Sequence, residues 1–368
     1  MKDLSHRFLC ACFRGDGGEA RTLMQNAGWD WERLFAEASD ESMLPALYGR
    51  MCEIGLNESL PHPVLNFLSG VESLNAERND AILGEVKLAV RLLNEIGIQP
   101  VLLKGLAYLA TGVYAAPAAR YLADVDLLIP EVQINPAAQA LMQNGFEADD
   151  SDPFARFRHH HPPLMRPGAV HFELHHALTM SQAGALLPAG KMIESSIAAD
   201  LDGVQVRVPS PEHMMAHLIM HSQLQHPYNE RIWPPVKAMY DLVLLQRRFE
   251  DEIDWNRIET RFRAAGRYRT FALHLLRVQD SLGFSPPIHI KLTPGLRAAW
   301  HRRQILRRFP VLRYVDPIYM FSIVIGRRLR LLMSILQTPR GLSCLRDELL
   351  KAHIYERFFE DMVKGRGR

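Results

Sequence analysis

Two aspartates separated by one residue, Asp124 and Asp126, lie within the apolar run Leu122 to Ile129. Alternate residues of a strand point to the same face, so the two carboxylates would share one face. Carboxylates this close repel one another unless a cation lies between them. Mg²⁺ is the usual cation for hard oxygen ligands that also bind phosphate. The pair therefore predicts metal-assisted phosphate chemistry, with nucleotidyl transfer as the leading hypothesis and both aspartates as catalytic metal ligands.

Glu173 is the candidate for a third acid. It follows Phe172 in a second apolar run of strand length, where a charged residue needs a reason to be present. If the two runs are neighbouring strands, Glu173 converges on the aspartates and either ligates a metal or helps to deprotonate an acceptor hydroxyl. The alternative is an exposed residue on the solvent face of an edge strand.

Lys104 and Gly105 follow a short apolar run and precede a short helix predicted to begin at Leu106. Backbone N–H groups at a helix start, with an ammonium nearby, form a phosphate-binding arrangement, and glycine allows close approach of the backbone. Arg120 carries a fork of donors suited to a triphosphate. Lys104, Gly105 and Arg120 are therefore predicted to bind the nucleotide, although any one of them alone is unremarkable.

Several histidines lie near Glu173 in the sequence. His175 shares its predicted strand face, and we expect His175 and His160 to support the acidic residues from nearby. Consecutive histidines, as at positions 159–161, cannot all face one ion, and no cysteine accompanies them. A zinc framework is therefore not predicted.

The elements that must position these residues divide the chain into three predicted regions. Residues 1–95 show apolar residues at helical spacing, with Asp30 as the N-cap of one helix. Residues 211–368 form a second helical series, which begins with Ser210 and Pro211 and includes a helix over residues 268–282. Between them, residues 96–210 contain short apolar runs at 99–103, 122–129, 169–175 and 204–208. The predicted fold class is α+β, with a small mixed-sheet core flanked by N- and C-terminal helical regions.

Composition is ordinary for a globular protein, with 368 residues, 48% of them hydrophobic, and a net charge of +2. Residues 291–368 carry 17 Lys and Arg against 6 Asp and Glu, which suits an anionic partner or simply a solvated helix face. The apolar stretch 318–336 is interrupted by arginines, so no transmembrane segment is predicted. Scattered cysteines and the lack of a leader pattern predict reduced thiols and a cytoplasmic location.

Several short motifs follow one another in an order typical of a known family. They are Val101-Leu102-Leu103-Lys104-Gly105, Arg120, Asp124-Val125-Asp126-Leu127-Leu128 and Phe172-Glu173-Leu174-His175-His176. The combination resembles the bacterial uncharacterised nucleotidyltransferase family, within the polymerase-β-like nucleotidyltransferase superfamily. The resemblance covers roughly residues 40–285, through Arg231, Asp241-Leu242 and Asp254-Trp255.

The resemblance implies a mixed sheet that holds Mg²⁺ and an NTP, with ATP the expected nucleotide. Two ions can be bound, and Mn²⁺ can substitute. On this basis Asp124 and Asp126 would be metal ligands and Glu173 the third acid. Lys104-Gly105 stands where the superfamily has Gly-Ser, and it lies farther from the aspartates than is usual.

Two hypotheses from different classes follow. In the first, the chain is an EC 2.7.7-type enzyme that transfers NMP from an NTP to an acceptor hydroxyl of a small molecule, sugar or protein, with pyrophosphate release. In the second, it is a catalytically weak nucleotide-binding or partner-binding module of the same fold, as the Lys-Gly departure suggests. Only the first predicts pyrophosphate release.

Overall fold

The computed structural model describes residues 2–149, 159–179, 182–225 and 232–314. The chain divides into two compact units, Met1–Leu296 and Arg297–Arg368. The larger unit contains every predicted site residue. The interrupted apolar stretch 318–336 and most of the basic C-terminal segment lie outside the described residues, so an anionic partner there stays a prediction. Among the described helices, none is both long and apolar enough to cross a membrane.

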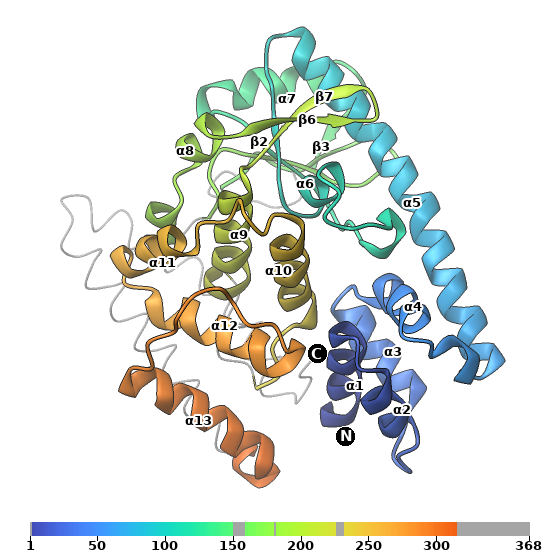
Figure 1. Cartoon of the computed structure of the whole chain (residues 1–368). Helices are drawn as coiled ribbons and strands as arrows, with labels where there is room; N and C mark the ends of the chain where they lie inside the picture. The colour runs from blue at the N-terminus through green and yellow to red at the C-terminus, as the bar shows by residue number, and fades with distance from the viewer. Residues whose placement is uncertain (1, 150–158, 180–181, 226–231, 315–368) are drawn as a thin grey trace. The chain divides into compact units, whose positions relative to one another are not determined.

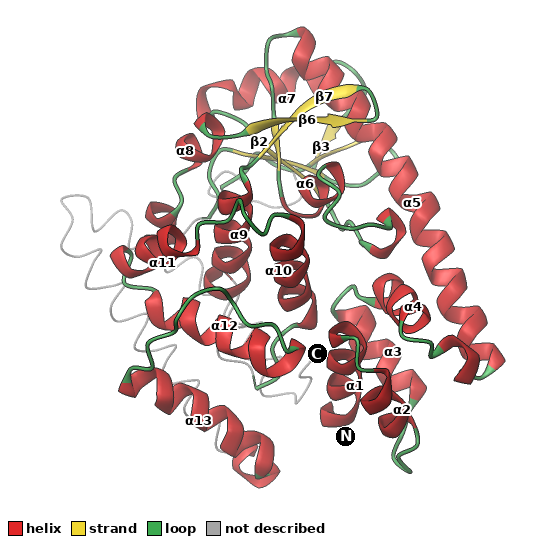
Figure 2. Ribbon diagram, viewed as in Figure 1, coloured by secondary structure: helices red, strands yellow, loops and turns green. Residues whose placement is uncertain are grey.

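The N-terminal part of the larger unit is helical (Figures 1 and 2). It contains α1 (Lys2–Arg14), α2 (Gly17–Met24), α3 (Trp31–Asp40), α4 (Leu44–Glu53), the 3-10 turn η1 (Asn57–Ser59) and α5 (His62–Glu95). The predicted N-cap of α3 is confirmed, because the Asp30 carboxylate accepts a hydrogen bond from the Arg33 N–H at 3.2 Å. Gly97 ends the 34-residue α5 with φ of +77°, a conformation that glycine adopts without a Cβ clash.

The central part alternates strands and short helices. Its elements are β1 (Val101–Leu102), α6 (Lys104–Ala110), η2 (Pro117–Ala119), β2 (Val125–Leu128), η3 (Glu131–Gln133), α7 (Ile134–Met142), β3 (Glu147–Ala148), β4 (Leu164–Met165), β5 (Phe172–His175), η5 (Gln182–Leu186), α8 (Ala189–Glu194), β6 (Ile197–Leu201) and β7 (Val204–Val208). The described strands form one sheet in the order β3-β4-β5-β2-β1-β7-β6. It is mixed, because β2 pairs with β5 and β1 with β7 in parallel, whereas the other pairs are antiparallel.

The C-terminal part is again helical. In the larger unit its elements are α9 (Pro211–Met220), the π-helical turn η6 (His221–Gln225), α10 (Val236–Arg248), α11 (Trp255–Ala264) and α12 (Tyr268–Leu282). Most of α13 (Pro294–Arg308) and the turn η8 (Pro310–Tyr314) belong to the smaller unit. The predicted α+β class, a mixed sheet with flanking helices, is confirmed. The described strands all fall inside the predicted segment 96–210, while the division into three regions stays a prediction.

The sequence located four strands, but their extent differs from the prediction. The segment 204–208 is correct as β7, whereas 99–103, 122–129 and 169–175 shorten to β1, β2 and β5. The short helix predicted from Leu106 begins earlier, at Lys104. The strands β3, β4 and β6 were not predicted: two of them are only two residues long, and β6 is largely exposed and lacks clear alternation.

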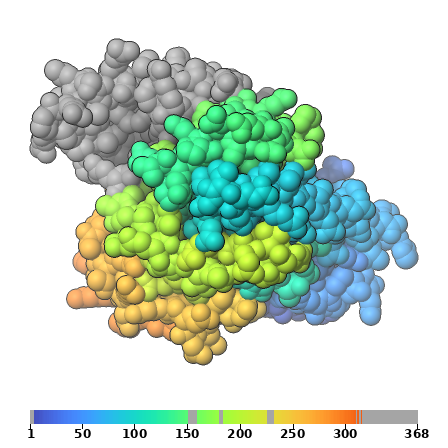
Figure 3. Space-filling view, turned by 90° about the horizontal axis from the view of Figure 1, so that it is seen from above, coloured from blue at the N-terminus to red at the C-terminus, as the bar shows by residue number. Residues whose placement is uncertain are grey.

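Strand β2 lies in the interior of the sheet, and all four of its residues are buried. Its neighbours β5 and β1 satisfy its backbone on both sides. Helices α5 and α7 pack against each other, α5 contacts β7, and α7 contacts β4 and β5. Figure 3 shows the later part of α5, in cyan, at the surface between the green α7 region and the yellow-green β6–β7 hairpin. A carboxylate on β2 is consequently removed from bulk water.

Helix α5 also fixes the turn that precedes β2. The Asn79 side-chain amide donates to the carbonyl of Arg120 at 2.8 Å and of Pro117 at 2.9 Å. Asn75, one turn earlier, donates to the carbonyls of Ala118 and Arg120 at 2.6 and 3.2 Å. Both asparagines are buried, and their amides replace water as donors to these carbonyls.

We predict that Asn79→Ala lowers the free energy of unfolding by about 1–3 kcal/mol, because it removes two buried hydrogen bonds to the turn before β2. Urea denaturation followed by circular dichroism measures the change. The matched control is Asn66→Ala, an exposed asparagine of the same helix, which should change stability by less than about 0.5 kcal/mol. Equal effects of the two substitutions would contradict the assigned role of Asn79.

Candidate active site

Lys104 and Asp126 meet because β1 and β2 are antiparallel. Leu102 pairs with Leu127, and the Leu103 N–H donates to the Asp126 carbonyl at 3.0 Å, so the residue after β1 lies beside the start of β2. The Lys104 ammonium nitrogen is 2.5 Å from Asp126 Oδ1. The side chain of Asp126 is only 3% exposed, so this charge-assisted hydrogen bond offsets the cost of burying the carboxylate.

Glu173 reaches Asp126 through the parallel register of β2 and β5. Asp126 pairs with Glu173, and Leu128 pairs with His175, so Glu173 and His175 lie on the same sheet face as Asp126. His175 Nε2 is 2.7 Å from Asp126 Oδ1 and 3.2 Å from Glu173 Oε2. The structure therefore brings the predicted third acid next to one aspartate, with a histidine N–H between the two carboxylates.

The sequence predicts Asp124 in the same strand as Asp126, but in the structure Asp124 precedes β2. It is partly buried, and it has no hydrogen-bond or ion-pair partner among the described residues. Asp124 and Asp126 line the same pocket, but the side chains with ligand atoms close together are Asp126, Glu173 and His175, all within 4.8 Å. The pair is thus adjacent at the pocket, although only one of its members is in the strand.

The charges of the cluster shift the pKa values of its members in opposite directions. Burial raises the pKa of Asp126, but Lys104 and His175 outweigh it and hold that pKa well below its usual range. Burial also raises the pKa of Glu173, and the hydrogen bond with His175 reverses the shift. Burial and the charge of Asp126 raise the pKa of Asp124. Asp124, which has no partner among the described residues, is therefore the carboxylate that most needs a cation.

His160 and His175 lie side by side, joined by an isolated antiparallel β-bridge. His160 Nδ1 donates to the His161 carbonyl at 2.7 Å, which points Nε2 toward Glu173 Oε1 at 3.9 Å. His175 makes the shorter contacts with the carboxylates. The structure thus brings both histidines to the acidic residues, with His175 the closer of the two.

The Lys104-Gly105 segment lines a pocket of about 310 Å³. Lys104 has φ of +50°, the left-handed region that costs a lysine of order 1–2 kcal/mol. A Cβ on Gly105 would lie 2.8 Å from Leu122 Cδ2 and 3.0 Å from Arg120 Nε. Only glycine fits here without displacing the residues in front of β2. Strain of this kind is concentrated at functional sites.

Arg120 lines the same pocket, but its guanidinium is buried and already paired. It lies 3.3 Å from Asp241 Oδ2, and the Tyr114 hydroxyl donates to the other oxygen of Asp241 at 2.5 Å. The guanidinium carbon is 5.7 and 5.6 Å from the ring centroids of Tyr108 and Tyr114. These contacts hold the Arg120 side chain against Gly105 as part of the pocket wall. Phosphate binding by Arg120 stays a prediction.

Lys237 is a pocket residue that the sequence did not reveal. It lies in the first turn of α10 and lines the pocket with Asp124 and Asp241. No hydrogen bond or ion pair engages it among the described residues. Burial and the nearby Arg120 lower its pKa to about 7. The i,i+4 spacing with Asp241 placed both on one helix face, but only the fold turns that face toward β2.

The donor set fits a hard divalent cation. Asp124 and Asp126 supply carboxylate oxygens at the pocket, and Glu173 supplies a third beside Asp126. Burial and the nearby charge of Asp126 raise the pKa of Asp124, so a cation at the pocket would favour its charged form. His175 Nε2 is engaged by both carboxylates, so it serves to orient them.

A second pocket, of about 420 Å³, lies elsewhere in the larger unit. Its lining includes Lys191, His213, Arg257 and Arg261. None of the predicted site residues belongs to it. The carboxylates, the strained Lys104 and the unengaged Lys237 all point to the smaller pocket instead.

Three comparisons with known proteins bear on the identity of this site. The family model described as "Uncharacterised nucleotidyltransferase" matches residues 27–283. No curated protein matched. Among solved structures, the antibiotic-resistance factor ANT(2'')-Ia is 15% identical, with 54% of this chain and 98% of that chain covered and a TM-score of 0.34. An antigenic nucleotidyltransferase-like protein from Paracoccidioides brasiliensis is 16% identical, covering 55% and 93%, with a TM-score of 0.36.

We predict that Gly105→Ala destabilises the chain by about 1–3 kcal/mol, because the new methyl group must displace Leu122 or Arg120. The matched control is Gly84→Ala on α5, where an added Cβ meets nothing within 4 Å. That substitution should leave stability unchanged or raise it by up to about 1 kcal/mol. Chemical denaturation of both variants measures the difference, and a Gly105→Ala protein as stable as wild type would refute the close packing.

Proposed function

Because this chain belongs to the uncharacterised nucleotidyltransferase family, we propose that it transfers NMP from an NTP to an acceptor hydroxyl and releases pyrophosphate. The observation that carries the proposal is the β2–β5 register, which sets Glu173 beside Asp126 while Asp124 faces the same pocket. The match to the family model supports the general reaction. Magnesium, the choice of ATP and the acceptor are parts of this proposal.

Asp124, Asp126 and Glu173 would hold Mg²⁺, with one or two ions bound and Mn²⁺ as a substitute. Such an ion supplies charge neutralisation for the phosphates and for the attacking and leaving oxygens of an in-line displacement. In that displacement, the acceptor oxygen forms a bond to the α-phosphorus while the bond to the pyrophosphate oxygen breaks. His175 would keep the two strand carboxylates oriented through its Nε2–H.

Cationic groups of the pocket would bind the triphosphate. Lys104 lies at the start of α6, and Gly105 lets the backbone approach a ligand closely. Lys237 enters from α10 and has no competing partner among the described residues. Arg120 would add to the positive potential of the pocket, while its ion pair with Asp241 keeps its side chain in the pocket wall. Positioning and electrostatic stabilisation would then supply most of the catalysis.

The acceptor would be a hydroxyl of a small molecule, a sugar or a protein side chain. The pocket, at about 310 Å³, lies at the small end of the range for ligand sites, so the acceptor would approach from its mouth. Its lining also includes Asp40, Glu41, Ser42, His217 and His221. Polar groups of this kind suit a hydroxylated acceptor.

A second candidate, a catalytically weak nucleotide-binding module, is favoured by one contact. The Lys104 ammonium lies 2.5 Å from Asp126 Oδ1, the oxygen that a metal ion would also have to approach. If Lys104 stays there when the nucleotide binds, it would act as a fixed substitute for a cation. Nucleotide binding would then survive with little turnover.

We predict that Asp126→Asn lowers pyrophosphate release by at least about a hundredfold, because the variant loses the carboxylate shared by Lys104, His175 and the metal. Wild type and variant are each incubated with MgCl₂ and one of the four NTPs, with and without a panel of hydroxylated small molecules and sugars, and pyrophosphate is quantified. The matched control is Asp80→Asn, an exposed aspartate of α5 that should retain full activity.

The outcomes separate the candidates. Release by wild type that Asp126→Asn abolishes supports the transferase, whereas equal release by both contradicts the site. Nucleotide binding, measured by calorimetry, without release from any acceptor favours the binding module. Absence of both binding and release would contradict both candidates.

We also predict that Lys237→Gln weakens ATP binding by about tenfold, the loss expected when one charge-assisted hydrogen bond to a phosphate is removed. Calorimetric titration in the presence of MgCl₂ measures the dissociation constant. Arg247→Gln, an exposed cation on the same helix, is the matched control and should bind ATP as wild type does. Equal weakening by both substitutions would mean that net charge matters and the position of Lys237 does not.

A further inference from the structure

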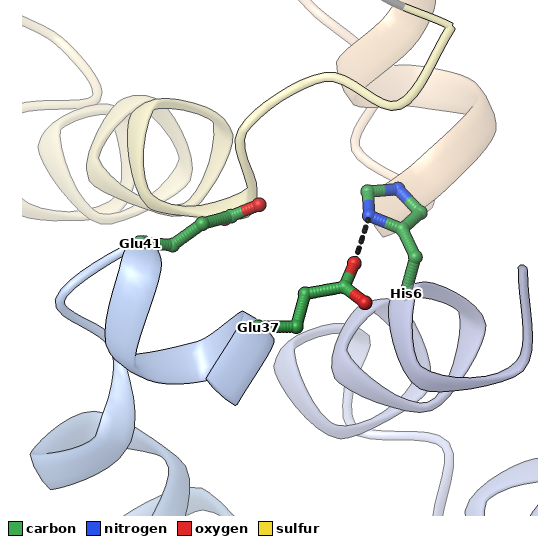
Figure 4. A group of neighbouring side chains, drawn as sticks. All are labelled: His6, Glu37 and Glu41. Carbon is green, nitrogen blue, oxygen red and sulfur yellow. Dashed lines mark ion pairs between the residues drawn. The ribbon is translucent and has the colours of Figure 1, made fainter. Parts of the chain in front are cut away.

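A second cluster of metal-ligating side chains lies among the N-terminal helices. His6 on α1 faces Glu37 on α3 and Glu41 just beyond the end of α3 (Figure 4). One ligand atom from each residue lies within 4.8 Å of the other two. None of the three belongs to the carboxylate cluster on β2 and β5. The cluster therefore needs an explanation of its own.

Burial makes this arrangement expensive unless something binds in it. The side chains of His6 and Glu37 are only 1% and 9% exposed. His6 Nδ1 points at Glu37 Oε1, but at 3.7 Å the contact is too long for a hydrogen bond. His6 Nδ1 has no hydrogen-bond partner among the described residues. A buried imidazole nitrogen aimed at a carboxylate without bonding to it is costly in an interior.

The other contacts of the three side chains orient them toward a common point. His6 Nε2 lies 3.5 Å from Cys10 Sγ, one helical turn along α1, and the His6 ring lies 5.1 Å from that of Trp233. Glu41 Oε2 accepts a hydrogen bond from the Val236 N–H at 2.5 Å. Nδ1 of His6 is thus the nitrogen available to a ligand, and Glu41 keeps one oxygen uncommitted.

The cluster is also short of positive charge. Two carboxylates face the imidazole of His6, and no lysine or arginine pairs with Glu37 or Glu41 in the described part of the chain. The surroundings therefore favour a cation at Nδ1, and the two cations that an imidazole nitrogen accepts are a proton and a metal ion.

We propose that His6, Glu37 and Glu41 bind a divalent transition metal, with zinc the expected ion. One imidazole nitrogen and two carboxylates form a donor set suited to such ions, whereas Mg²⁺ and Ca²⁺ prefer oxygen alone. The ion would join α1, α3 and, through the second oxygen of Glu41, the N-terminus of α10. Its role is structural, and it is separate from the proposed nucleotidyl transfer.

The site adjoins the pocket. Glu41 lines the same pocket as Lys237, and its bond to Val236 reaches the residue next to that lysine. An ion that fixes Glu41 would therefore help to hold the start of α10 in place. Loading of the site would stabilise the N-terminal helices in the folded state, since a ligand that binds only the native chain raises its stability.

Zinc binding to the full chain tests the proposal. All measurements use proteins stripped of metal and carrying Asp126→Asn, which removes a ligand from the other cluster. Equilibrium dialysis against ZnCl₂ should show that adding Glu37→Gln, which keeps the size of the side chain, removes about one bound zinc per chain. Glu32→Gln, an exposed glutamate of the same helix, is the matched control and should remove none.

Thermal unfolding gives an independent readout. Zinc should raise the Tm of the Asp126→Asn protein and of its Glu32→Gln form, but not of its Glu37→Gln form. Glu41→Gln, whose amide oxygen can still accept from Val236, should behave as Glu37→Gln does, and it replaces that variant if circular dichroism shows a folding defect. If the Glu37→Gln and Glu41→Gln forms bind as much zinc as the control, the cluster holds only a proton and the proposal is wrong.

Discussion

The constraint on which the site depends is the burial of one carboxylate. Asp126 lies in an interior strand with its side chain 3% exposed, and Oδ1 is contacted by Lys104 at 2.5 Å and His175 at 2.7 Å. Removing either partner would leave a buried charge with too little compensation. Because the partners come from opposite neighbours of β2, the antiparallel β1 and parallel β5 pairings must both be in register for this carboxylate to be tolerated.

The surroundings of the pocket follow from the same requirement. The chain before β2 is held by the two asparagines of α5, and its Arg120 is held by Asp241 of α10. Gly105 is confined between Arg120 and Leu122, so the start of α6 and the turn before β2 pack as one piece. The strained backbone at Lys104 is therefore maintained from several directions, as expected where the surrounding structure determines an unfavourable conformation.

Charge balance connects this packing to function. Asp124, Asp126 and Glu173 face Lys104 and His175, so the cluster can persist without a metal, yet Asp124 keeps no partner among the described residues. A bound metal ion would balance the negative charge of Asp124 and of a nucleotide at the pocket. Whether Lys104 moves away from Asp126 when the metal ion and nucleotide bind decides between an active transferase and a binding module. Lys237, on a separate helix, can contribute in either case.

The sequence by itself determined what depends on local pattern. The bounds of α12 and β7, the Asp30 cap, the buried character of Asp126 and the family resemblance could all be predicted, because helical period, strand alternation and capping act between residues close in the chain. It missed the strands β3, β4 and β6 and the pocket residue Lys237, and it placed Asp124 inside the strand that the structure begins at Val125. It also did not reveal the pairing of Arg120 with Asp241. Strand register and the direction in which a helix face points are set by contacts between distant segments. Only the tertiary structure could therefore decide that Lys104, Glu173 and His175 meet at Asp126 while Arg120 is paired with Asp241.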